Sequence, residues 1–122
     1  MNPCFAIIDR NTLESTALKD ILWELFNHVE ICTYCDMDAF IRDSNRHFIH
    51  FFVDSDILFR YIDEFVTLKN QTTVLYEGAG AKFIKEGFNV LDLSLGEGEL
   101  KNKIMQTQLV SRYEQQMDEG RR

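Results

Sequence analysis

Two aspartates, Asp9 and Asp54, each directly follow a short apolar run of the sequence. Such runs are typical of strands that are buried on both faces of a parallel sheet. Ligands bind to such a sheet beyond the carboxyl ends of the strands, where the strand order reverses. Two carboxylates that met there could hold Mg²⁺ through oxygen ligands, or one could accept a phosphoryl group. The residues alone also allow a simpler reading, in which both aspartates only cap the helices that follow.

The elements that would position these aspartates form a regular alternation of strand and helix patterns. Apolar and β-branched runs predict strands over residues 5–8, 29–34, 48–53, 72–76 and 90–93. Helical spacing predicts helices over residues 12–27, 36–43, 57–65, 81–86 and from about 97 through Leu109. Connections of this length suit parallel strands. We therefore expect an α/β fold, a flavodoxin-like (βα)5 three-layer sandwich with a five-stranded parallel sheet of order 2-1-3-4-5.

The first helix has the clearest local signals. Asn11 can cap its start, and Glu14 can reach back to the Asn11 backbone as in a capping box. The predicted apolar stripe then follows helical spacing and consists of Leu13, Ala17, Leu18, Ile21, Leu22, Leu25 and Phe26.

Length and charge narrow the range of functions. The chain has 122 residues, which fits one domain, and we expect it to occupy residues 1–110, with a polar tail or linker over residues 111–122. A net charge of -7 argues against direct contact with nucleic acid or an anionic membrane. No apolar run is long enough for a membrane helix. Three cysteines, an odd number, argue against a disulfide framework, and we expect a cytoplasmic protein.

The cysteines and histidines offer weaker signals of chemistry. Cys32 and Cys35 have C-x-x-C spacing, which could indicate thiol redox chemistry or zinc, or only small buried side chains. His47 and His50 are three residues apart around the third predicted strand. Residues three apart in a strand lie on opposite faces, so these histidines are not expected to share a metal.

The segment Ile7-Ile8-Asp9-Arg10-Asn11-Thr12-Leu13 resembles the opening of response-regulator receiver domains from bacterial two-component systems. It is most similar to receivers that precede a LuxR-type helix-turn-helix output domain, and the order of elements agrees from about Phe5 to Leu109. The resemblance implies that Asp54 is the candidate phosphoacceptor and that Asp9 belongs to the acidic pocket. Any Mg²⁺ site would then consist of Asp9 and Asp54.

The sequence departs from the receiver pattern at four other positions. Arg10 stands where the family has a second acid, and Tyr76 or Glu77 stands where it has a small hydroxyl residue. The conserved lysine of the family falls on Ser94, and its switching aromatic falls near Leu91. A cation at position 10 predicts weak or absent Mg²⁺ binding. We consider two placements of Arg10, a bridge between Asp9 and Asp54 or a side chain in solvent.

These departures favour an atypical receiver that acts through protein contacts, with impaired or absent phosphorylation of Asp54, and not an enzyme. It would control the DNA-binding output domain of a transcription regulator outside this chain. Homodimerisation through the fourth helix, fifth strand and fifth helix is implied by the resemblance, with Met105 and Val110 as candidate contacts. The alternatives are a working phosphoreceiver served by a histidine kinase, and a flavodoxin-like redox protein or other enzyme.

Overall fold

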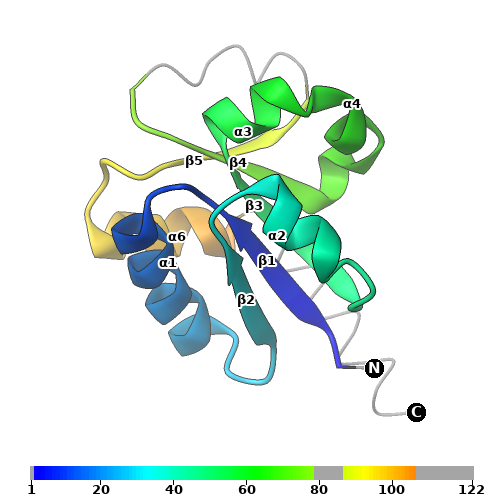
Figure 1. Cartoon of the computed structure of the whole chain (residues 1–122). Coiled ribbons are helices and arrows are strands. Elements are labelled where there is room, and N and C mark those ends of the chain that lie inside the picture. Colours follow the sequence, from blue (N-terminus) through cyan, green and yellow to red (C-terminus); the bar gives the residue numbers. More distant parts are fainter. Residues whose placement is uncertain (1, 79–86, 107–122) are drawn as a thin grey trace.

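The computed structural model describes residues 2–78 and 87–106 (Figure 1). The strands are β1 (Cys4–Ile8), β2 (Glu30–Tyr34), β3 (Phe48–Asp54), β4 (Thr72–Tyr76) and β5 (Asn89–Asp92). The helices are α1 (Thr12–Leu25), α2 (Met37–Arg42), α3 (Ser55–Arg60), α4 (Ile62–Phe65), the 3₁₀ helix η1 (Val66–Gln71) and α6 (Glu97–Met105).

The five strands form one parallel sheet in the order β2-β1-β3-β4-β5, which confirms the predicted topology. Helices α1 and α6 cover one face of the sheet, and α2, α3 and α4 lie on the other (Figure 1). The strand order reverses between β1 and β3, so the carboxyl ends of these two strands flank the point where ligands bind in such folds.

Alternate residues of the central strands supply the two halves of the core. Phe5 and Ile7 point into the cluster beneath α1 and α6, whereas Ala6 and Ile8 point into the cluster beneath α2, α3 and α4. All five residues of β1 are buried. This double burial is why the strand reads as an unbroken apolar run in the sequence.

A buried polar pair joins the third and fourth strands. His50 Nε2 lies 2.7 Å from Thr73 Oγ1, and both residues are buried. His47, in contrast, is exposed at the start of β3. The two histidines therefore do not form one site. This agrees with their spacing, which predicted that they would not share a metal.

The start of α1 differs from the prediction in two ways. Asn11 does cap the helix, because its side chain accepts hydrogen bonds from the backbone N–H groups of Leu13 and Glu14. The predicted capping box is wrong, since the Asn11 N–H donates to Asp9 Oδ1 at 2.9 Å and not to Glu14. Leu13 is also 82% exposed, so the buried stripe begins later, at Leu18.

The helix predicted over residues 57–65 is broken into two. Helix α3 ends at Arg60, because the backbone of the next residue, Tyr61, leaves the helical region with φ -117° and ψ 36°. Helix α4 begins directly after it, at Ile62. Helix α3 also begins earlier than predicted, at Ser55, because Asp54 serves as its N-cap. The helix predicted over residues 81–86, the candidate contact Val110 and the polar tail over 111–122 lie outside the described residues.

No helix among the described residues is long and apolar enough to cross a membrane.

Candidate functional site

Asp9 and Asp54 lie at the switch point of the sheet, as predicted. An open cleft of about 410 Å³ is lined there by Asp9, Arg10, Asn11, Glu14 and Asp54. Asp9 directly follows β1 and is buried, whereas the side chain of Asp54, at the end of β3, is 18% exposed. Asp54 therefore faces the cleft and remains accessible from solvent.

Arg10 closes over the outer side of this cleft. Its Nε atom donates to Asp54 Oδ2 at 3.1 Å, and a terminal nitrogen of the same guanidinium donates to Asp56 Oδ2 at 2.6 Å. These contacts raise the pKa of Arg10 above its ordinary value, with the hydrogen bond to Asp54 as the main cause. The bridge thus joins Asp54 to Asp56, and the predicted bridge between Asp54 and Asp9 is wrong in its second partner.

Asp9 has a different environment from Asp54. Its Oδ1 atom accepts the Asn11 N–H, and its buried Oδ2 atom accepts no N–H group among the described residues. The Glu14 carboxyl group lies within hydrogen-bonding reach of Asp9, so a proton on Glu14 could be shared with it. Burial raises the pKa of Asp9, and the nearby charge of Asp54 adds to the rise. An unpartnered buried carboxylate oxygen is costly unless the group takes up a proton or a cation.

Glu14 belongs to this site, although its spacing from Asn11 predicts only a capping role. Burial, a hydrogen bond with Glu77 and the charge of Asp9 raise the pKa of Glu14 to about 7. Glu77 follows β4 and was predicted only as a switch-position residue. The signal that could have identified Glu14 is its place in the first turn of the helix that follows Asp9, which brings it to the same edge of the sheet.

The donor set at this edge fits Mg²⁺ poorly. Asp9 and Asp54 supply carboxylate oxygens, the ligands that Mg²⁺ prefers, and no N–H group among the described residues reaches Asp9 Oδ2. However, the Arg10 guanidinium already neutralises Asp54 Oδ2 and adds a positive charge where a cation would have to approach. A metal at this position would have to displace Arg10 from Asp54.

The remaining receiver-like positions differ from one another in burial and contacts. Tyr76 ends β4 and is half-buried, and Glu77 is exposed beside it. Leu91 is buried in the core cluster beneath α1 and α6. Ser94 donates from its backbone nitrogen and its hydroxyl to Asp92 Oδ1, at 3.0 and 2.7 Å. None of these four side chains carries a positive charge that could stabilise a phosphorylated Asp54.

The C-x-x-C cysteines do not act as a pair. Cys32 lies in β2 and is half-buried, whereas Cys35 is exposed and its sulfur lies 3.9 Å from Asp36 Oδ2. The neighbour of Cys32 is instead Cys4 on β1. Burial raises the pKa of the Cys4 thiol to about 11, so this thiol is protonated and a poor nucleophile at neutral pH. The expectation of small buried side chains is therefore wrong for Cys35, which is exposed, and holds only in part for Cys32, which is half-buried.

Comparison with solved structures places the fold among receivers. The chain is similar to a response regulator receiver protein from Pseudoalteromonas atlantica, at 16% identity and TM-score 0.64, over 85% of this chain and 95% of that one. It is also similar to the signal receiver domain of an HD domain-containing protein from Pseudomonas fluorescens Pf-5, at 14% identity and TM-score 0.64, over 95% and 93%.

A third similar structure is a response regulator receiver modulated diguanylate cyclase from Pelobacter carbinolicus, at 17% identity and TM-score 0.63, over 92% and 95% of the two chains. No protein-family model matches the sequence, and no curated protein matches it. At these identities the likeness concerns the fold.

Proposed function

We propose that this chain is an atypical receiver domain that transmits signals through protein–protein contacts, with phosphorylation of Asp54 impaired or absent. The observation that carries this proposal is the Arg10 guanidinium, which bonds to both Asp54 and Asp56 at the switch point. The guanidinium is a cation fixed on the candidate phosphoacceptor, and it takes the position in which a metal would have to bind. The receiver fold of the similar structures supports the same assignment.

The second candidate function is a phosphoreceiver that accepts a phosphoryl group on Asp54 from a histidine kinase. The observation that favours it is the 18% exposure of the Asp54 side chain on an open cleft. Arg10 itself is 54% exposed and held by surface ion pairs, which are individually weak. A kinase could therefore reach Asp54 if Arg10 swung away.

The partners follow from the proposed role. We expect a cytoplasmic protein whose receiver controls an output domain, with DNA binding by that domain in a transcription regulator. The net charge of -7 argues that this chain itself does not contact DNA. Similar structures belong to an HD domain-containing protein and a diguanylate cyclase, so receivers of this fold serve several kinds of output.

The test is an amide NMR titration of the protein with Mg²⁺ and beryllofluoride, a mimic of phosphorylated aspartate. The proposal predicts that the signals of Asp9, Asp54 and β4 stay unshifted up to millimolar Mg²⁺. Asp54→Ala and the exposed control Asp63→Ala should give the same flat titration.

Saturable shifts in the unmodified protein that disappear in Asp54→Ala and persist in Asp63→Ala would establish the phosphoreceiver instead. Asp54 would then act as acceptor despite Arg10, and the proposal of an impaired receiver would be wrong.

A further inference from the structure

A second group of metal-binding side chains lies at the opposite end of the sheet from Asp54. Cys4 begins β1 and Glu30 begins β2, and the two residues are direct neighbours in the register of these strands. Cys32 lies two residues beyond Glu30 in β2, so its side chain lies on the same face of the sheet. The strand pairing itself therefore brings two sulfurs and one carboxylate together.

The three side chains are already close to the distances that a metal needs. Cys4 Sγ lies 3.7 Å from Glu30 Oε2, and Cys32 Sγ lies 4.0 Å from Glu30 Oε1. One ligand atom from each of the three residues lies within 4.8 Å of the other two. In a tetrahedral zinc site with Zn–S bonds of about 2.3 Å, two sulfurs are about 3.8 Å apart. Movements of the ligand atoms by about 1 Å, through side-chain rotation, would thus complete the site.

We propose that Cys4, Cys32 and Glu30 form a Zn²⁺ site at the amino-terminal ends of β1 and β2. Two sulfurs and one carboxylate oxygen suit Zn²⁺ better than Mg²⁺ or Ca²⁺, which prefer oxygen ligands alone. On binding, each thiol would release its proton to solvent and ligate as a thiolate. A water molecule would supply the fourth ligand.

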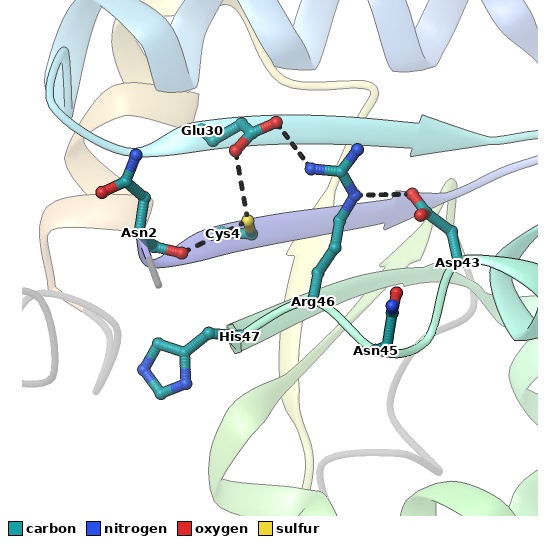
Figure 2. A pocket seen from close by; sticks show the side chains of 7 residues that line it. All are labelled: Asn2, Cys4, Glu30, Asp43, Asn45, Arg46 and His47. Carbon is teal, nitrogen blue, oxygen red and sulfur yellow. Dashed lines mark hydrogen bonds and ion pairs between the residues drawn. The ribbon is translucent and has the colours of Figure 1, made fainter.

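Access to the site is through a surface pocket of about 390 Å³, shown in Figure 2. Asn2, Cys4 and Glu30 line it on one side, and Arg46 and His47 line it on the other. The His47 imidazole points away from Cys4 in Figure 2, although its carbonyl accepts the Cys4 N–H at 2.9 Å. Two of the three proposed ligands, Cys4 and Glu30, line this pocket, which has room for a metal ion and a water molecule beside the Cys4 sulfur.

Arg46 holds the carboxylate in place for this role. It donates to Glu30 Oε1 at 2.8 Å and to Asp43 Oδ2 at 2.7 Å, and it leaves Glu30 Oε2 directed toward Cys4 (Figure 2). A hydrogen bond to the outer oxygen of a ligating carboxylate is a usual outer-sphere contact of metal sites. The guanidinium also offsets part of the negative charge that two thiolates and a carboxylate would bring.

The experiment uses Co²⁺, a spectroscopic stand-in for Zn²⁺, with the reduced, metal-free protein. We expect a thiolate-to-cobalt charge-transfer band and the visible bands of tetrahedral Co²⁺, both saturating at one equivalent and both abolished by added Zn²⁺. Cys32→Ala should weaken Co²⁺ binding by more than ~100-fold. Loss of a residue that only contacts a ligand, without binding the metal, costs at most about 100-fold, so a larger loss identifies Cys32 as a ligand. Cys35→Ala, which removes the exposed cysteine beyond β2, should leave binding unchanged.

Cys4→Ser, the second ligand variant, should also weaken Co²⁺ binding. If loss of the buried Cys4 sulfur prevents folding, Cys32→Ala still tests the proposal. The proposal is overturned if the unmodified protein shows no saturable thiolate band. It is also overturned if binding survives in Cys32→Ala, or if it is lost in Cys35→Ala, since the C-x-x-C pair would then hold the metal.

Discussion

At the scale of single residues, the carboxylates of the switch-point cleft lie in two different electrostatic environments. Asp54 is neutralised by the Arg10 guanidinium, whereas the buried Asp9 and the half-buried Glu14 lie close together with no salt-bridge partner among the described residues. Carboxylates that crowd in this way favour uptake of a proton. The cleft should therefore respond to pH even if it does not respond to Mg²⁺.

Glu14 is the residue through which that response should be seen. Its pKa is raised from 4.5 to about 7 in the folded protein, so between these values the fold holds a proton that the unfolded chain releases. The stability that comes from this proton is fully present below pH 4.5 and is lost as the pH rises toward about 7.

Glu14→Gln should remove this pH dependence. The part of the unfolding free energy that changes with pH through Glu14 is about 1–2 kcal/mol, after allowance for the partial exposure of the side chain. The measurement is urea unfolding across this pH range, with the exposed Glu64→Gln as control. If Glu14→Gln leaves the pH profile of the unfolding free energy as steep as before, the proton is held elsewhere.

At the scale of elements, the structure separates two leucines of α1 that the sequence pattern put on one apolar stripe. Leu22 is fully buried beneath the helix, whereas Leu13 is 82% exposed. Leu22→Ala should lower the free energy of unfolding by about 2–5 kcal/mol because it leaves a cavity in the core. Leu13→Ala should change it by less than about 0.5 kcal/mol. Denaturant unfolding of both variants tests this, and equal losses would contradict the described orientation of α1.

The strands and the topology could be predicted from the sequence because each central strand is buried on both faces. Residues 48–53 and 72–76 are short, largely apolar or β-branched runs, which are typical of strands covered on both faces, and the structure places β3 and β4 there. The break between α3 and α4 could not be predicted, since Tyr61 and Ile62 continue the helical spacing and only the backbone at Tyr61 departs from it.

The candidate site was predictable in position and not in its contacts. Strand ends place Asp9 and Asp54 at one edge, but no sequence rule distinguishes Asp9 from Asp56 as the second partner of Arg10. The register of β1 and β2 likewise brings Cys4 beside Glu30 and Cys32, although Cys4 is far from both in the sequence. Such cross-strand neighbours become visible only once the pairing of the strands is known.

At the scale of the whole molecule, the proposed role needs a surface for partners. Met105 is 49% exposed on α6, on the face that the receiver resemblance assigns to dimer contacts. If a homodimer uses this face, Met105→Asp should weaken it by about tenfold or more, which corresponds to about 1.4 kcal/mol. Phe59→Asp, on α3 across the sheet, should not weaken it, although Phe59 is 68% exposed.

Sedimentation equilibrium over a range of concentrations measures both variants against the unmodified chain. A chain that stays monomeric at every concentration, or a dimer that only Phe59→Asp disrupts, would rule out the α6 face as the dimer contact.

We propose that Arg10 occupies the place where a receiver would need a metal. The most direct measurement is calorimetric titration of Mg²⁺ into the unmodified protein and into Arg10→Asp, which restores an acidic residue beside Asp9. We expect no saturable heat for the unmodified protein and saturable, one-to-one binding for Arg10→Asp. Equal Mg²⁺ affinity in the two proteins would show that Arg10 has no bearing on the metal position, and the proposed role of Arg10 would then be wrong.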